Sequence, residues 1–599
     1  MRDFADTRSS TLRHRWSTIG AAALLMCATA TGELAADADQ RSAPEAATLG
    51  DEIAGRVAVR AKSQMVAAAN PHAAAAGLAM LRRGGGAIDA AIAMQMVLNV
   101  VEPQSSGIGG GAFLLFHDRS SRTTSAYDGR ETAPSAATPD MFLAVGGAPM
   151  PFFEAVVGGL AVGVPGLLRM LELAHGDHGR LPWGDLFAPA IKLAEEGFAI
   201  SPRLNALIAR DPYLRTFAAA RVYFYDEDGA PRPVGFHRRS PVLAQTLRVI
   251  ADGGADAFYA GPIARDIVVA VRGAMPGPGR LTERDLATYR AVRREPLCGP
   301  YRSWRVCGMP PPTSGGVTTL QVLGILDYFN VASHPAGSVD AVHLMAEASR
   351  LAYADRGRYL ADPDFIDIPV AGLLNRDYLR RRASAIRLDR SMGAATAGAL
   401  GPPHGAFAPQ AAQPERASTS HLSVVDGAGD AVAMTLSIES AFGSRLMVRG
   451  FLLNNQLTDF SFVPRQDGLK VANSVAPGKR PRSSMAPTLV FDRHGRLVMA
   501  VGSPGGSAII GYVAKTIVAV LDWRYDIQAA IDLPHHVNLN GPVFLEQDTT
   551  IEALAPGLHA RGHEVVIRPL NSGLHGITID DAGLAGGADR RREGVAIGD

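Results

Sequence analysis

The chain has 599 residues, of which 47% are hydrophobic and 20% are charged, and its formal net charge is +1. This composition is typical of a globular protein that is long enough to bury a large core. The near balance of 59 basic and 58 acidic residues removes the electrostatic basis for binding nucleic acid or an anionic membrane surface.

The N-terminus has the layout of a secretory signal. Arg13 and Arg15 precede an apolar stretch from Ile19 to Ala30, which ends in the small residues of an Ala-x-Ala cleavage site. A membrane-spanning helix is the alternative, but the stretch is shorter than the roughly 20 residues that a bilayer requires. We therefore expect a signal peptide at 1–30, a flexible leader at 31–55, and a periplasmic or secreted product with no membrane anchor.

Regular structure is expected to begin with a strand at Met65–Ala69. An amphipathic helical run at 71–101 follows, and then a second strand at Ala112–His117. The glycine-rich segment at 107–111 lacks the spacing and the downstream acid of a nucleotide-binding loop. Helical and strand segments then alternate to about residue 387, which favours a mixed fold of the α+β or α/β class.

Two cysteines, Cys298 and Cys307, remain after the expected signal is removed. They flank a segment that can fold as a hairpin around 301–304, which would place them opposite each other. An oxidising compartment would allow a disulfide between them. Two unpaired thiols fit the sequence equally well, because the strand register is not fixed by the pattern alone.

Residues 391–418 are rich in Gly, Ala and Pro and lack periodicity, which is typical of a mobile connector. Strands are predicted directly after it, at His421–Val425, Ala431–Ile438, Gly450–Asn454, Thr488–Phe491 and Leu497–Val501. Helical runs around 508–524 and 526–533 and a strand pair at Phe544–Leu545 and Val565–Pro569 lead to a polar C-terminus.

The first two strands after the connector suggest a particular chemistry. Asp426–Asp430 is a strong turn, and if it centres on Ala428, Thr419 lies opposite Ser437. A cut before Thr419 would free its α-amino group, whose usual pKa is near 8, to act as a base on its own hydroxyl. The alternative is that Thr419 only begins a strand.

The run from Thr419 to Gly443 resembles the signature of the γ-glutamyltransferase family of N-terminal nucleophile hydrolases. Further segments resemble blocks of that family, in the family's order: Met65–Pro71, Val101–Gly111, Gly129–Pro134, Met309–Gly316, Leu453–Gln456, Lys479–Met485 and Gly502–Ser507. The resemblance implies a four-layer αββα sandwich of the α+β class. It also implies autocleavage between Ser418 and Thr419 into a large subunit, 56–418, and a small catalytic subunit, 419–599, which together build the sandwich.

The resemblance also assigns roles to individual residues. Thr419 matches the nucleophile, Ser437 its supporting hydroxyl, and Gly505 and Gly506 the amides of an oxyanion hole. The residues matching the binding site for a glutamyl head group are Arg130, Ser483 and Ser484 for its carboxylate and Gln456 and Asp459 for its ammonium. No metal is expected, since the 16 histidines show no ligand spacing. No organic cofactor is expected either, because the implied mechanism needs none.

Two departures from the family pattern bear on the substrate. Glu439 stands where many members have an asparagine at the glutamyl head, and the segment between Ser461 and Lys479 is shorter than a long lid. We expect a γ-glutamyltransferase or glutathione hydrolase acting on glutathione and related amides. A glutaryl or cephalosporin acylase of the same family is the alternative, and an inactive periplasmic protein that binds γ-glutamyl peptides is a third possibility.

Overall fold

The structure, a computed structural model, describes residues 57–400, 407–410 and 418–599. The expected signal peptide and leader, and residues 401–406 and 411–417 of the connector, lie outside these ranges. Within the described residues, no helix combines the length and apolarity needed to cross a bilayer.

Two seven-stranded sheets form the centre of the fold, and all neighbouring strands within them pair antiparallel. The first sheet has the order β1 (Val59–Ala61), β22 (Gly583–Ala588), β21 (His575–Asp580), β17 (Leu497–Gly502), β16 (Thr488–Phe491), β9 (Trp304–Gly308) and β8 (Leu297–Tyr301). The second has the order β23 (Val595–Gly598), β2 (Met65–Ala68), β10 (Ser420–Val425), β11 (Ala431–Ser437), β3 (Gly111–Asp118), β4 (Thr123–Gly129) and β7 (Val292–Arg294). Each sheet therefore contains strands from both sides of residue 418.

Both faces of the second sheet are buried, as the alternation along β3 shows. Leu114 and Phe116 pack into the core beneath the helices, whereas Phe113 and Leu115 point to the core shared with the first sheet. Burying a side chain of this size contributes about 1.5–3 kcal/mol. A strand that is apolar on both sides therefore fixes the sheet between two layers.

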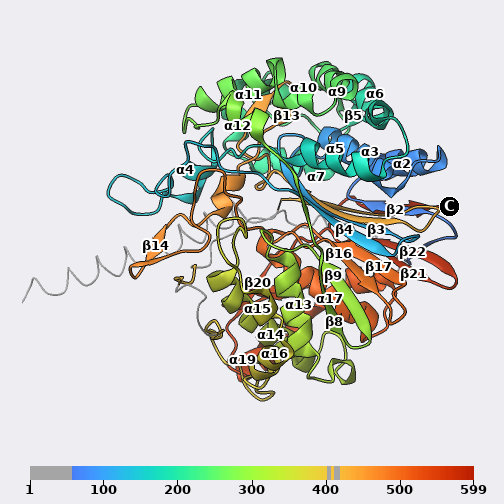
Figure 1. Cartoon of the computed structure of the whole chain (residues 1–599), viewed down its shortest axis with the longest axis vertical. Helices are drawn as coiled ribbons and strands as arrows, with labels where there is room; N and C mark the ends of the chain where they lie inside the picture. Colours follow the sequence, from blue (N-terminus) through green and yellow to red (C-terminus); the bar gives the residue numbers. More distant parts are fainter. Residues whose placement is uncertain (1–56, 401–406, 411–417) are drawn as a thin grey trace, which may run out of the picture. The chain divides into compact units, whose positions relative to one another are not determined.

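Helices cover the outer face of each sheet and complete four layers (Figure 1). The second sheet is covered by α2 (Pro71–Arg82), α3 (Ala87–Val101) and α5 (Leu167–His178), and the first by α13 (Gly315–Leu326), α14 (Val339–Tyr359), α17 (Ile509–Leu521) and α18 (Ile527–Asp532). The expected αββα sandwich of the α+β class is confirmed.

The remaining elements surround this sandwich. The helices are α4 (Phe152–Val156), α6 (Ala188–Glu196), α7 (Pro202–Arg210), α8 (Ala218–Phe224), α9 (Pro241–Gly253), α10 (Asp256–Tyr259), α11 (Pro262–Arg272), α12 (Glu283–Thr288), α15 (Val370–Leu373), α16 (Arg376–Ala383) and α19 (Ala555–Ala560). The small sheets are β5–β6 (Phe198–Ala199, His237–Arg238), β12–β13 (Met447–Val448, Phe451–Leu452), β14–β15 (Arg465–Gln466, Leu469–Lys470) and β18–β19–β20 (His536–Asn538, Val543–Glu546, Val565–Arg568).

Three sequence predictions differ from the structure. The helical run at 71–101 is two helices, because three glycines at 84–86 interrupt it and Gly84 has φ 88°. The strand expected at Gly450–Asn454 contains only two strand residues, in β13. The C-terminus supplies β21, β22 and β23 to the two central sheets, although its polar composition gave no such indication.

The cysteine pair is joined. Cys298 and Cys307 face each other across the β8–β9 hairpin and form a disulfide. This outcome settles the alternative that the sequence left open and confirms the hairpin.

Candidate functional site

The β10–β11 hairpin brings Thr419 and Ser437 together, with the register that the turn predicted. Ser420 pairs with Leu436 and Val425 with Ala431. Just before the first of these pairs, the hydroxyl of Thr419 lies 3.1 Å from that of Ser437, and both residues are buried.

The peptide bond before Thr419 lies within reach of both hydroxyls. The Thr419 hydroxyl donates to the carbonyl oxygen of Ser418, which also accepts from the Ser437 hydroxyl at 3.4 Å. The Ser418 hydroxyl is held by the carbonyl of Gln104 at 2.7 Å, and the Ser437 oxygen accepts from the amide of Glu439 at 2.8 Å. The Ser418–Thr419 bond is thus fixed beside the hydroxyl oxygens of Thr419 and Ser437.

A pocket forms around this bond from residues that are distant in sequence. Its cavity measures about 20 Å³, which is room for roughly one water molecule. Ten of the predicted site residues line it together with Met485 and Ile509: Arg130, Ser418, Thr419, Ser437, Glu439, Gln456, Asp459, Ser483, Ser484 and Gly506.

Arg130 is the buried cation of the pocket. Its guanidinium forms an ion pair with Asp459 and donates to the carbonyl of Pro481 at 3.1 Å. Gln456 donates to the same Asp459 carboxylate at 2.9 Å. Glu131 lies 3.7 Å from the guanidinium, and its burial raises the pKa of its carboxyl to about 8, although the charge of Arg130 opposes that shift.

Ser483 and Ser484 are held by α14 and by the turn that precedes α13. Ser314 donates to the carbonyl of Ser483 at 2.6 Å, and Arg356 donates to the Ser484 hydroxyl at 2.6 Å. Arg356 also bonds Ser314 at 2.8 Å. Sequence reasoning did not identify Arg356, since it lies within a long helix with no motif of its own.

Glu439 projects into the pocket from a strained backbone. Its φ of 78° is in the left-handed region, which residues other than glycine adopt at a cost of about 1–3 kcal/mol. The side chain of Asn455, which was also not predicted, donates to the Glu439 carboxylate at 2.6 Å. The pocket thus contains one guanidinium and two carboxylates, those of Glu439 and Asp459.

The Gly505–Gly506 turn requires glycine. Both residues have positive φ, 136° and 58°, and a Cβ on Gly505 would lie 2.6 Å from the ring of Tyr512. Gly506 lines the cavity, whereas Gly505 lies on Tyr512. Tyr353 of α14 donates to the carbonyl of Ser507, which anchors the turn from the other side.

The segment after Phe460 folds back on the pocket wall. It carries the β14–β15 hairpin, and Asn473 donates to the backbone carbonyl of Asp459 at 2.7 Å. Lys479 closes the segment by donating to the carbonyls of Ala472 and Ser474 at 2.6 and 2.9 Å. The sequence predicts that this segment is shorter than a long lid, and its effect on substrate access stays a prediction.

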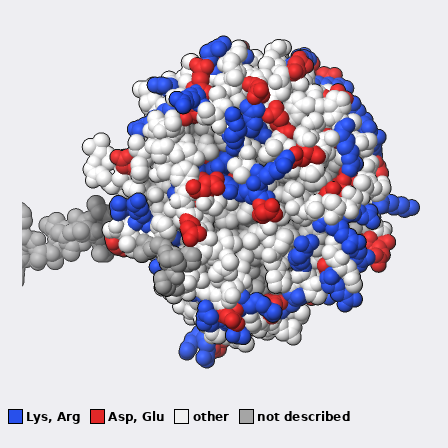
Figure 2. Space-filling view, viewed as in Figure 1, with Lys and Arg blue, Asp and Glu red and all other residues white. Residues whose placement is uncertain are grey.

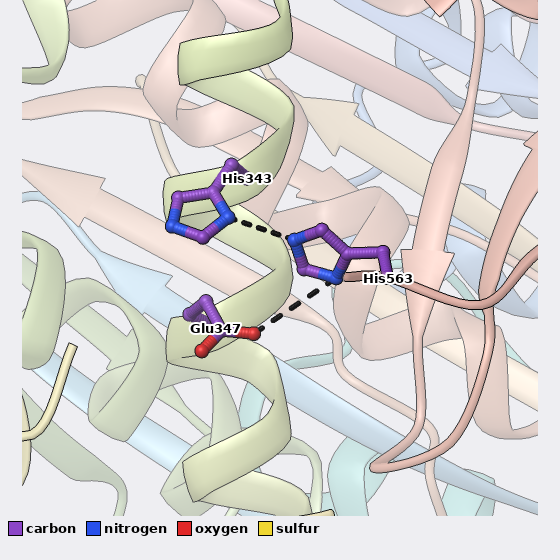
Figure 3. A group of neighbouring side chains, drawn as sticks. All are labelled: His343, Glu347 and His563. Carbon is purple, nitrogen blue, oxygen red and sulfur yellow. Dashed lines mark hydrogen bonds and ion pairs between the residues drawn. The ribbon is translucent and has the colours of Figure 1, made fainter. Parts of the chain in front are cut away.

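A second polar cluster lies at α14, away from the pocket. His343, Glu347 and His563 form a group of potential metal ligands among the described residues, and Figure 3 shows the two imidazoles turned toward each other. Their Nδ1 and Nε2 atoms are 2.7 Å apart, which is a hydrogen-bond distance and is closer than two nitrogens on one tetrahedral zinc, roughly 3.3 Å. Arg350 donates to Glu347 at 3.2 Å and places a positive charge in the cluster. The geometry is that of a hydrogen-bonded network, and the expected absence of a metal stays a prediction.

This network holds the start of the connector. The carboxylate of Glu347 accepts from the hydroxyl of Ser391 at 3.0 Å and from the amide of Met392 at 2.9 Å. His343 donates through Nε2 to the carbonyl of Arg387 at 2.7 Å.

Surface charges of both signs are interspersed on the face shown in Figure 2. This mixture agrees with the balanced composition of the chain.

Comparison with known proteins identifies the family. The model of the family described as gamma-glutamyltranspeptidase matches residues 73–599. The glutathione hydrolase proenzyme of Bacillus subtilis (strain 168) is 39% identical over 547 residues, covering 90% of this chain and 92% of that protein. The Acylase ACY 1 proenzyme of Pseudomonas sp. (strain SE83) is 35% identical over 551 residues, covering 89% of this chain and 93% of that protein.

The solved structure of a cephalosporin acylase from Bacillus halodurans has a TM-score of 0.76 and 28% identity, covering 91% of this chain and 97% of that one. The chain therefore belongs to the gamma-glutamyltranspeptidase family.

Proposed function

We propose that the chain is a self-processing γ-glutamyltransferase and glutathione hydrolase whose nucleophile is Thr419. The observation that carries the proposal is the Thr419 hydroxyl, which contacts the Ser418 carbonyl and lies 3.1 Å from Ser437 in a pocket lined by Arg130 and Asp459. The similarity to glutathione hydrolase proenzymes supports the same activity.

Processing uses the groups already in contact. The Thr419 oxygen attacks the carbonyl carbon of Ser418, the C–N bond breaks, and an ester joins Ser418 to the threonine oxygen while the α-amine takes the proton. Water then hydrolyses the ester, which leaves a carboxylate on Ser418 and a free N-terminus on Thr419. The two products remain associated, because both contribute strands to each central sheet.

Turnover repeats this chemistry on a substrate. The neutral α-amine of Thr419 removes the proton from the threonine hydroxyl, directly or through a water molecule, as the hydroxyl attacks the γ-amide carbonyl. The amides of Gly505 and Gly506 stabilise the oxyanion. The amine of the substrate then leaves and takes the proton from the α-amine of Thr419. Water, or the amine of an amino acid or peptide, then resolves the γ-glutamyl ester.

The charges of the pocket suit a zwitterionic head group. Arg130, Ser483 and Ser484 receive the α-carboxylate, and Asp459, Gln456 and Glu439 receive the α-ammonium. In the uncut chain Arg130 is paired with Asp459 and the cavity holds only about 20 Å³. The pocket must therefore widen before a glutamyl group enters, and the cut beside it gives the chain freedom to do so.

The acylase alternative has support from ACY 1 and from the cephalosporin acylase fold. A glutaryl group lacks the α-ammonium, so it would bring no positive charge to the carboxylates of Asp459 and Glu439. Initial rates on γ-glutamyl-anilide and glutaryl-anilide decide the matter. We expect the γ-glutamyl substrate to be preferred, and a glutaryl preference would favour the acylase.

Export to the periplasm or beyond is part of the proposal. The arrangement of residues 1–30 supports it, and so does the Cys298–Cys307 disulfide, since such bonds persist in oxidising compartments.

The test is to replace the nucleophile. Wild-type protein should separate into two chains on a denaturing gel and should hydrolyse γ-glutamyl-anilide. Thr419→Ala should stay a single chain and lose at least about a thousandfold in activity. A wild-type chain that stays intact would contradict self-processing, and if it still bound γ-glutamyl peptides, it would support the inactive binding protein.

A further inference from the structure

A buried arginine from the C-terminal end of the chain contacts the nucleophile residue. Arg592 lies between β22 and β23 and is 4% exposed. Its Nη1 donates to the main-chain carbonyl oxygen of Thr419 at 2.7 Å, and its Nε donates to the carbonyl oxygen of Ser572 at 2.8 Å. The guanidinium thus connects the nucleophile with a second buried segment.

Gly573 has no side chain, and this leaves room for the side chain of Arg592 beside it. A Cβ at that position would lie 2.7 Å from Cδ of Arg592 and 2.5 Å from Cγ of Pro504, which precedes the Gly505–Gly506 turn. The arginine stem therefore lies against a glycine beside the turn that carries the oxyanion amides. A larger residue at 573 would displace either the arginine or the turn.

Ser572, the second residue that Arg592 contacts, is itself held by buried hydrogen bonds. The hydroxyl of Ser572 donates to the carboxylate of Asp589 and lies 2.6 Å from Nε2 of His535. His535 in turn lies 2.8 Å from the ammonium nitrogen of Lys515, and Tyr512, which contacts Gly505, packs on its ring. Arg592 is thus attached to a fully buried network and not to a mobile surface segment.

We propose that Arg592 is a positioning residue for catalysis, which holds the main chain of Thr419 so that the threonine hydroxyl keeps its place between Ser437 and the oxyanion amides. The inference rests on the proposed function. After cleavage Thr419 loses its covalent link to Ser418, so this carbonyl hydrogen bond restrains a residue that is otherwise held by the forward chain and by the hydroxyl contact with Ser437. The contribution of Arg592 should therefore be larger in turnover than in folding.

The positive charge of Arg592 has a separate consequence for the freed amine. The α-amine is on the same residue as the carbonyl that Arg592 binds, roughly 6 Å from the guanidinium. A like charge at that distance disfavours the ammonium form and lowers the pKa of the amine. Other charged or titratable groups around this position, among the residues that the structure describes, include the Glu102–Arg203 ion pair, Glu439, the Arg130–Asp459 ion pair, His421 and His575. Burial lowers the pKa of both histidines below its usual range.

The experiment compares Arg592→Met, Arg592→Lys and the control Arg590→Met, whose side chain instead faces Asp532 at 3.7 Å. Rates on γ-glutamyl-anilide are expressed per mole of processed small chain, and thermal unfolding is recorded alongside.

For Arg592→Met we expect kcat to fall about 10- to 100-fold, while KM stays within about threefold of wild type. The acidic limb of the kcat/KM profile should move up by about 0.5–1 pH unit. Arg592→Lys should keep the limb in place and lose about 3- to 10-fold in kcat, because an ammonium cannot reproduce the two-pronged contact of the guanidinium, and Arg590→Met should match wild type.

The proposal is overturned if Arg592→Met keeps kcat within threefold of the control, or if Met and Lys move the acidic limb equally. Should Arg592→Met not fold, the lysine variant alone decides: an unmoved limb with reduced kcat supports positioning, and an unchanged kcat refutes it. A failure of the proposed function is distinguishable, because wild-type protein would then remain uncut or be cut elsewhere.

Discussion

The two halves of the pocket are built in different ways. The half that carries the proposed nucleophile comes from one hairpin, β10–β11, in which Thr419 and Ser437 are 18 residues apart. The half that we propose binds the substrate head comes from separate loops, and Arg130 and Asp459 are 329 residues apart. Local strand pairing therefore positions the proposed nucleophile, whereas long-range packing positions the charges proposed to select the substrate.

Apart from replacement of Thr419 itself, the largest effect on the reaction is expected from Gly505→Ala, in the turn whose Gly506 lines the same pocket. A Cβ 2.6 Å from the Tyr512 ring, at φ 136°, would displace the amides of the turn. We expect kcat to fall about 100- to 1000-fold. Gly495→Ala is the matched control, since Gly495 has φ 77° but open space around it. Equal kinetics for the two variants would remove the turn from the mechanism.

The substrate half should respond through binding. Arg130→Met removes the buried guanidinium and leaves Asp459 without its ion-pair partner, so we expect kcat/KM to fall about 100- to 1000-fold, mostly through KM. Arg445→Met removes another buried ion pair, with Asp211 at 2.8 Å, outside the pocket. That variant should lose stability but keep KM. An unchanged KM in Arg130→Met would show that the head group binds elsewhere.

A smaller effect is expected at Ser437, whose hydroxyl supports that of Thr419. Ser437→Ala should slow both processing and turnover about tenfold, because a single hydrogen bond to Thr419 contributes about 1–1.5 kcal/mol. Ser437→Thr keeps the hydroxyl and should stay within about threefold of wild type. If Ala and Thr behave alike, the 3.1 Å contact has no role in the reaction.

The smallest effect concerns stability and lies outside both halves. Burial lowers the pKa of His563 to about 4, from an ordinary value of 6.5. Between pH 6.5 and 4 the unfolded chain binds more protons than the folded chain, so stability is lost as the pH falls through this window, by about 1–3 kcal/mol. Urea unfolding of the uncut Thr419→Ala variant at pH 7 and 4.5 measures the loss. His563→Gln should reduce this pH dependence, and an unaltered dependence would show that other groups cause it.

The sequence was most informative where structure is local. The Asp426–Asp430 turn gave the correct register for Thr419 and Ser437, and the 298–307 segment formed the expected hairpin. The residues predicted for the head group also lie together, but only the family resemblance could place Arg130 beside Asp459, because no local pattern connects them.

Two features that were not predicted, the C-terminal strands and the contact of Arg592, have a common physical cause, which is packing that glycine permits and sequence patterns do not reveal. Strand β22 contains Gly586 and Gly587, where an added Cβ would lie 2.5 Å from Sδ of Met65 and 2.9 Å from Cδ1 of Ile531. Glycine weakens a strand pattern, so the C-terminal strands were not predicted. Arg592 was missed for the same reason, since its contact with Thr419 depends on the space at Gly573 and on these strands.

The central claim is that Thr419 becomes a free N-terminus and attacks the substrate from there. The most direct test is N-terminal sequencing of the small chain from purified, active protein. We expect a sequence that begins Thr-Ser-His, from Thr419 to His421, in material that releases aniline from γ-glutamyl-anilide. An active protein whose chain is uncut, or is cut at any other bond, would contradict it.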